Sequence, residues 1–157
     1  MPERSATQRS ITHATFTIER HYDATPARVF RAWADPAAKA RWFGSHDNWK
    51  TSSYELDFRV GGRERLKISP VAGGVVHAFD GIYQDIVPDQ RIIYSYDMHL
   101  DDRRISVSLA TVELTADDSG TRLIFTEQAA FLDGQDNVAQ RKEGTQSLLD
   151  GLGRGLA

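Results

Sequence analysis

Six consecutive strand-like stretches, separated by turn signals and free of proline, constrain the fold of this chain more than any other feature. They cover 54–60, 63–69, 75–87, 91–99, 105–115 and 121–131. In the first stretch, apolar and polar residues alternate from Tyr54 to Val60, the period of a strand with one buried face. Strands joined by short turns pair with their sequence neighbours. The middle of the chain therefore predicts an antiparallel meander.

The turn signals indicate how closely these strands follow one another. Gly61-Gly62 predicts a two-residue hairpin between the first two strands. Pro88-Asp89 places proline and aspartate where a tight turn favours them, and 70–74 is expected to be a loop. Asp101-Asp102 and the segment 117–120 predict the two remaining turns. All connections within the meander are thus expected to be short.

One strand and two short helices are expected before the meander. Residues 14–22 alternate in the same way, with Phe16, Ile18 and Tyr22 on the apolar face. Thr25-Pro26 and Asp35-Pro36 each combine a capping side chain with proline at the first helical position, so each predicts a helix start. The second helix is expected to end at Gly44, because glycine commonly follows a helix.

The last segment, 137–157, predicts a long helix with one apolar face. Its leucines at 148, 149, 152 and 156 recur at helical spacing. Glycines at 144, 151, 153 and 155 each cost about 1 kcal/mol relative to alanine, so packing must stabilise this helix. A strand, two helices, six strands and a final helix indicate the α+β class, with a seven-strand antiparallel sheet.

Length and composition set the domain count and exclude several classes of protein. With 157 residues, we expect one domain over 13–157 after a disordered tail over 1–12. A net charge of −3 argues against nucleic acid as a partner. No segment has the roughly 18 apolar residues of a membrane span, and the N-terminus lacks a secretory signal. The absence of cysteine excludes disulfides and fits a cytoplasmic location.

Several motifs carry a family resemblance. The segment 24–33, Ala-Thr-Pro-Ala-Arg-Val-Phe-Arg-Ala-Trp, together with Asp35-Pro36 and Arg41-Trp42-Phe43, resembles the opening of the START-like (SRPBCC, helix-grip) superfamily. More narrowly, the chain resembles the branch related to the activator of the heat-shock protein 90 ATPase. The resemblance continues through 56–62, 83–92, 120–123 and 126–128, and covers nearly everything from Thr12 onward.

The resemblance implies a helix-grip fold, in which a curved sheet wraps around the C-terminal helix and encloses a cavity. It implies a small, mostly apolar ligand of the lipid, polyketide or aromatic type, no cofactor, and a homodimer as a further expectation. It also suggests a chaperone-related interaction module as an alternative. Relatives often place a tryptophan early in the last helix, whereas 143–146 here reads Glu-Gly-Thr-Gln. The cavity of this chain is therefore expected to be roomier or more mobile than in relatives.

Aromatic and apolar side chains are the first candidates for binding a ligand. Rings supply large contact areas, and a tyrosine adds a polar tip that orients a ligand. Tyr94 and Tyr96 share one face of one strand, whereas ordinary core packing remains the alternative for each ring. The candidate ligand-binding residues are Trp42, Arg65, His77, Phe79, Tyr83, Tyr94, Tyr96, Glu127, Phe131, Leu148 and Leu152.

Arg65 is a candidate because it belongs to a row of charged residues. Asp57, Arg59, Arg63 and Arg65 fall on one parity across the Gly-Gly turn, so their side chains are expected on one face. Guanidinium groups at a cavity end would hold a carboxylate or phosphate with paired donors. The alternative is a solvated ladder of ion pairs on the outer face of the sheet. The sequence leaves both interpretations open.

Glu127 is the single candidate for catalysis. It shares its parity with Leu123 and Phe125, and an acid on an apolar face must either meet a cation or keep a proton. Arg65 and Arg141 are the expected partners for an ion pair. A raised pKa would instead suit general acid or base work in a cyclase or hydrolase. Whether the protein is an enzyme stays open.

Metal chemistry finds little support in the sequence. His77, Asp97 and His99 are competent ligand types, but no spacing such as HExxH supports a metal site. No serine lies in a nucleophile turn, so a catalytic triad is not expected either. We therefore expect neither a metal nor a cofactor.

Overall fold

A seven-stranded sheet and a long C-terminal helix dominate the computed structural model, which describes residues 8–44 and 47–156. The element order matches the predicted one, and the α+β helix-grip class is confirmed. The elements are β1 (Ile11–Tyr22), α1 (Pro26–Ala34), α2 (Pro36–Ala40), β2 (Trp49–Leu56), β3 (Arg63–Pro70), β4 (His77–Val87), β5 (Arg91–Leu100), β6 (Arg103–Asp117), β7 (Gly120–Leu132) and α3 (Val138–Leu156).

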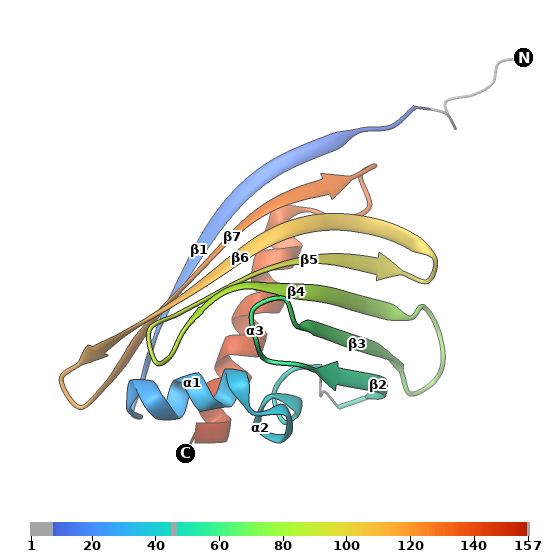
Figure 1. Ribbon diagram of the computed structural model, residues 1–157. Coiled ribbons are helices and arrows are strands. Elements are labelled where there is room, and N and C mark those ends of the chain that lie inside the picture. The colour runs from blue at the N-terminus through green and yellow to red at the C-terminus, as the bar shows by residue number, and fades with distance from the viewer. Residues whose placement is uncertain (1–7, 45–46, 157) are drawn as a thin grey trace, which may run out of the picture.

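The strands form one antiparallel sheet in the order β1-β7-β6-β5-β4-β3-β2. The predicted meander from β2 to β7 is confirmed, and β1 joins its far edge by pairing with β7, with Phe16 opposite Glu127. The sheet curves around α3, while α1 and α2 lie together at one end (Figure 1). This arrangement leaves the concave face of the sheet opposite one face of α3.

The concave face and the helices bury a common core. Phe16 and Ile18 of β1 are at most 6% exposed, as expected from their alternation. Leu149 and Leu152 of α3 are each 1% exposed and close the core from the other side. Burying a leucine stabilises the fold by about 1.5–3 kcal/mol, so these contacts offset the low helix propensity of the glycines in α3.

Both short helices begin as predicted. Thr25 Oγ1 accepts a hydrogen bond from the backbone N–H of Arg28 at 3.3 Å, and Asp35 Oδ2 accepts one from Ala38 at 3.0 Å. α2 ends at Ala40 and not at Gly44, so its expected end was wrong by one turn. The residues after α2 form a turn, which brings Trp42 into the core at 6% exposure.

The predicted two-residue hairpin at Gly61-Gly62 is wrong. β2 ends at Leu56, and 57–62 form a longer loop. The loop folds against β4, because Gly61 donates its backbone N–H to the Tyr83 carbonyl at 2.8 Å and Tyr83 donates to the Gly62 carbonyl at 3.0 Å. A Cβ at residue 62 would lie 2.0 Å from the Asp57 carbonyl oxygen. Glycine is therefore required there by close approach of the backbone.

The beginning of the chain lies partly outside the described residues. Of the tail expected over 1–12, residues 1–7 are not described, whereas Ile11 and Thr12 pair with β7. Asp133 accepts hydrogen bonds from the backbone of Ser10 at 3.0 Å and from Arg9 at 3.3 Å. Within 8–44 and 47–156, no helix is both long and apolar enough to cross a membrane.

Candidate functional site

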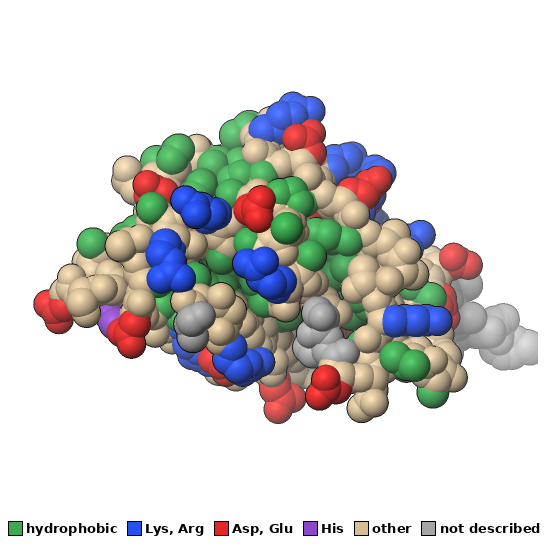
Figure 2. Space-filling view, turned by 90° about the horizontal axis from the view of Figure 1, so that it is seen from below, with side chains coloured by type: hydrophobic (Ala, Val, Ile, Leu, Met, Phe, Trp, Pro, Cys, Tyr) green, Lys and Arg blue, Asp and Glu red, His purple; other side chains and the backbone are tan. Residues whose placement is uncertain are grey.

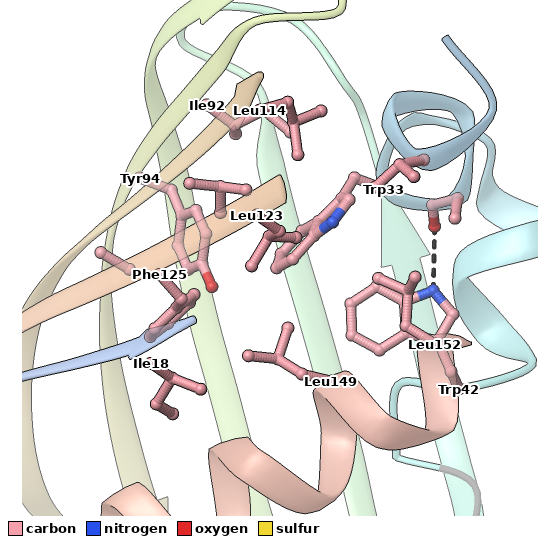
Figure 3. Packing of buried hydrophobic residues seen from close by; sticks show 14 of the residues in the cluster. Ile18, Trp33, Trp42, Ile92, Tyr94, Leu114, Leu123, Phe125, Leu149 and Leu152 are labelled. Carbon is pink, nitrogen blue, oxygen red and sulfur yellow. Dashed lines mark hydrogen bonds between the residues drawn. The ribbon is translucent and has the colours of Figure 1, made fainter. Parts of the chain in front are cut away.

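A cavity of about 450 Å³ lies between the concave face of the sheet and α3. Such a volume is typical of sites that bind a small organic molecule. Figure 3 shows Tyr94 and Phe125 of the sheet facing Leu149 of α3. All three residues line the cavity. The helix contributes to the wall from Gln140 to Leu149, so the cavity runs along its first half.

One wall of the cavity is aromatic. Its rings come from α1, the turn after α2, β4 and β5, and they are Trp33, Trp42, Phe43, Phe79, Tyr94 and Tyr96. Trp33 and Trp42 meet edge to face at 4.9 Å between ring centroids, and Phe79 stacks on Tyr96 at 4.6 Å. Trp42 also donates its Nε1–H to the Ala32 carbonyl at 3.0 Å (Figure 3). These contacts hold the wall in one arrangement.

The polar part of the cavity is built around Glu127, which is fully buried. Its Oε2 accepts a hydrogen bond from the Tyr96 hydroxyl at 2.7 Å and another from Arg141 at 3.1 Å. Arg141 also donates to Asp136 at 2.9 Å and to Ser106 at 2.7 Å. Of the two arginines expected as partners of Glu127, Arg141 is the one that pairs with it.

Two buried polar atoms stand out because no described residue hydrogen-bonds to them. They are Trp33 Nε1 and Glu127 Oε1. An unpaired buried polar atom costs about 1–3 kcal/mol, and more when it belongs to a charged group. Tyr96 differs from them, because burial and the neighbouring Glu127 raise the pKa of its hydroxyl and keep it a donor. Because Tyr96 and Arg141 both donate to Oε2, the described residues leave Oε1 of Glu127 as a free hydrogen-bond acceptor beside the cavity.

The structure separates the candidate binding residues into two groups. Seven of them line the cavity: Trp42, His77, Phe79, Tyr94, Tyr96, Glu127 and Leu148. His77 packs edge to face on Trp49 at 5.0 Å. Burial lowers the pKa of His77, which favours a neutral imidazole at neutral pH. The cavity thus brings together residues from β4, β5, β7 and α3.

The other four candidates lie away from the cavity. Arg65 is half exposed on the outer face of the sheet, 3.6 Å from Asp80 and 3.7 Å from Glu55. It forms the solvated ladder of ion pairs and holds no group inside. Phe131 lies beneath the Arg141 guanidinium, with 5.3 Å between the guanidinium carbon and the ring centroid.

Leu152 and Tyr83 are displaced from the cavity for different reasons. Leu152 lies further along α3 and borders a separate space of about 160 Å³ next to α1 and α2. Tyr83 is 1% exposed, and its hydroxyl donates to Glu64 Oε1 at 2.6 Å. Its polar tip is therefore used inside the protein.

Sequence reasoning missed a buried ion pair behind the aromatic wall. Lys39 Nζ lies 2.8 Å from Glu64 Oε1, and both side chains are 1% exposed. Tyr54 donates to the other oxygen of Glu64 at 2.6 Å. Burial lowers the pKa of the Lys39 amine, and the Glu64 carboxylate opposes that shift. Glu64 lies two residues before Leu66 and so on the same buried face of β3. This spacing was the one feature of the sequence that could have indicated a buried Glu64.

The ammonium group of Lys39 also contacts aromatic rings. Its Nζ lies 4.5 Å from the centroid of Phe43 and 4.9 Å from that of Trp33. Trp42 and Tyr94 contribute two further rings, at 5.5 and 5.8 Å. All four rings line the cavity as well, so this ion pair fixes the wall from behind.

Hydrophobic side chains reach the surface on the side of the molecule where the helices lie (Figure 2). Figure 2 shows hydrophobic side chains gathered in the middle of the face seen from below, with charged side chains around them. This is the side on which α1, α2 and the end of α3 lie in Figure 1. Gly144 of α3 lines the cavity, and a Cβ added there would meet no atom within 4 Å.

Comparisons with known proteins agree with one another. A model of the family described as activator of Hsp90 ATPase homolog 1-like protein matches residues 23–157. A Rhizobium leguminosarum structure is similar at 50% identity and TM-score 0.91, covering 96% of this chain and 98% of that one. A Rhizobium loti structure is similar at 47% identity and TM-score 0.86, and the match covers 93% of this chain and 99% of that one. An Aeromonas hydrophila protein of the same family is similar at 26% identity and TM-score 0.71, and the match covers 91% of this chain and 92% of that one. No curated protein matches the chain.

Proposed function

The chain belongs to the family of activator of Hsp90 ATPase homolog 1-like proteins, within the START-like superfamily, and from this membership we propose that it binds one small, mostly apolar molecule. The observation that carries the proposal is the cavity of about 450 Å³ with its aromatic wall. Sites for small organic molecules have this volume and this mainly apolar lining with a few polar groups.

The lining also favours one type of ligand over others. Among lipids, polyketides and aromatic molecules, ring-bearing compounds fit the wall best, because offset and edge-to-face ring contacts add about 0.5–1.5 kcal/mol beyond burial of area. Phe79, Tyr94 and Tyr96 present such rings side by side. A flat molecule with an apolar body is the ligand that these contacts support.

Titration with N-phenyl-1-naphthylamine, a neutral probe that fluoresces in apolar surroundings, tests the proposal. We expect one probe to bind per chain, in the cavity of about 450 Å³ between the sheet and α3. Gly144→Trp is expected to weaken binding at least tenfold, since the indole occupies the open space at this position. Circular dichroism checks that the variant stays folded.

Glu143→Trp is the matched control, because residue 143 is exposed on the same helix and lies outside the cavity lining. Probe binding by this variant is expected to equal that of the wild type. Two results would count against the proposal: no binding by the wild type, or equal weakening by both tryptophan variants.

An enzyme remains the second candidate function. A carboxylate buried next to a cavity and hydrogen-bonded to a tyrosine hydroxyl is an arrangement that acid–base catalysis uses. In a cyclase- or hydrolase-type reaction, Glu127 would transfer the proton. If a substrate is found and the Glu127→Gln variant turns it over at the full wild-type rate, Glu127 does not have this role.

Four further expectations stay predictions. They are a homodimer, a cytoplasmic location, the absence of nucleic acid as a partner, and a chaperone-related interaction as an alternative to ligand binding. The last is suggested by the family description alone. The cavity itself favours ligand binding over that alternative, because docking onto another protein needs no internal space.

A further inference from the structure

We infer that the molecule held in the cavity carries an O–H or N–H donor that binds Glu127 Oε1, and that the cavity rejects molecules with an anionic head. The inference rests on the proposed function and names the chemistry of its ligand. It is carried by two observations, the unpartnered carboxylate oxygen and the balance of charges along the cavity wall.

The first observation concerns the donors around Glu127. Tyr96 and Arg141 both donate to Oε2, while Oε1 receives no hydrogen bond from any described residue. The two terminal nitrogens of Arg141 also donate to Ser106, Asp136 and the hydroxyls of Tyr96 and Ser108. The free oxygen therefore needs a donor from outside the described residues. Glu127 lines the cavity, so a molecule in the cavity is placed to supply it.

The second observation is the charge of the wall. Its charged side chains are Glu127, Asp136 and Arg141, which together carry a formal charge of −1, and His77 is favoured in its neutral form. The Lys39–Glu64 pair behind the wall adds no net charge. An anionic head would face this excess negative charge beside the fully buried Glu127, where repulsion is stronger than in water. A hydroxyl or a protonated amine would not.

The aromatic wall accommodates the same kind of molecule. Tyr96 connects the two regions, since its ring stacks on Phe79 while its hydroxyl donates to Glu127. An apolar body against Phe79 and Tyr96 would thus place its polar end at the carboxylate. A protonated amine would gain additionally from the ring faces.

Four naphthalenes that share one body and differ in the head group test the inference by displacing N-phenyl-1-naphthylamine. They are 2-methylnaphthalene, 2-naphthalenemethanol, 2-naphthylmethylamine and 2-naphthoate. We expect the alcohol or the amine to bind at least tenfold more tightly than the hydrocarbon, and the carboxylate to bind most weakly. The stronger of the two donors indicates whether the natural head is neutral or cationic.

Glu127→Gln separates the hydrogen bond from other effects. Tyr96 and Arg141 are expected to keep the amide oxygen of the glutamine, which leaves its NH₂ group as the free atom. The order should then change: the protonated amine, which can only donate, loses its advantage over the hydrocarbon, the alcohol can still accept from the NH₂ group, and the carboxylate gains at least tenfold. Asp136→Asn removes the same charge without changing Glu127, so the amine should keep an advantage over the hydrocarbon there, while the carboxylate gains.

Each outcome bears on a defined claim. Equal binding of all four naphthalenes to the wild type would mean that a water molecule donates the hydrogen bond to Glu127 Oε1. This result would overturn the inference but not the proposed function. Equal loss of the amine's advantage in both variants would also overturn it, because charge alone would then set the order. Binding of N-phenyl-1-naphthylamine with no displacement by any of the four would overturn the inference alone, whereas no binding of N-phenyl-1-naphthylamine would contradict the proposed function.

Discussion

Lys39→Met, with Glu64 left in place, is expected to lower the free energy of unfolding by about 3–5 kcal/mol. The substitution leaves the Glu64 carboxylate buried without its cation, and both side chains are 1% exposed. Tyr54 and Tyr83 still donate to Glu64, but two neutral donors do not replace the charge. Urea unfolding followed by circular dichroism measures the loss.

The double variant Lys39→Met/Glu64→Gln makes the test independent of whether the single variant folds. Glutamine removes the unpaired charge, keeps one acceptor oxygen for a tyrosine hydroxyl, and can donate its NH₂ group to the other hydroxyl, so the double variant should recover at least half of the lost stability. A single variant that loses less than about 1 kcal/mol, or a double variant less stable than the single one, would show that the ion pair does not hold the aromatic wall.

Alkaline pH is expected to produce the second large effect on stability. Burial raises the pKa of all five tyrosines of the chain, which are Tyr22, Tyr54, Tyr83, Tyr94 and Tyr96. Above pH 10 the unfolded chain loses its phenol protons while the folded chain keeps them, so the unfolded state binds fewer protons. Stability is therefore fully present below about pH 10 and falls as the pH rises.

The expected slope is steep. Each buried tyrosine contributes up to about 1.4 kcal/mol per pH unit, and four of the five are less than 9% exposed, so the slope approaches roughly 5 kcal/mol per pH unit above pH 10. Urea midpoints measured at several pH values give this slope, and phenolate absorbance should appear only with unfolding. Tyr83→Phe should make the slope shallower. Phenolate absorbance that develops near pH 10 in folded protein would contradict the expectation.

Much of the fold was predictable because each strand has a single buried face. The alternation in 14–22 and 121–131 identified residues such as Phe16 and Phe125 that the structure buries at 6% and 3% exposure. The loop over 57–62 was not predictable in this way. Its shape depends on contacts with Tyr83 of β4 and on the close approach of Gly62 to the Asp57 carbonyl, which no local pattern reveals.

The candidate site was predictable only in part. The alternation of side chains along a strand tells which residues share a face of the sheet. The alternation along each strand placed Tyr94 and Tyr96 on one face of their strand and Glu127 on an apolar face, and all three line the cavity. For Arg65 it indicated a shared face with Arg63 but not whether that face was the inner one, and the face is exposed. Lys39 gave no signal at all. It lies in a helix of five residues, which is too short to show a period.

Native mass spectrometry of the protein purified from the cells that naturally make it tests the central claim most directly. The account predicts a retained molecule at one copy per chain, with an apolar body and a hydroxyl or amine donor, and its loss from the Gly144→Trp variant purified in the same way. A chain that carries no small molecule in its native extract and binds none of the naphthalene probes would contradict the claim that the cavity between the sheet and α3 is a binding site.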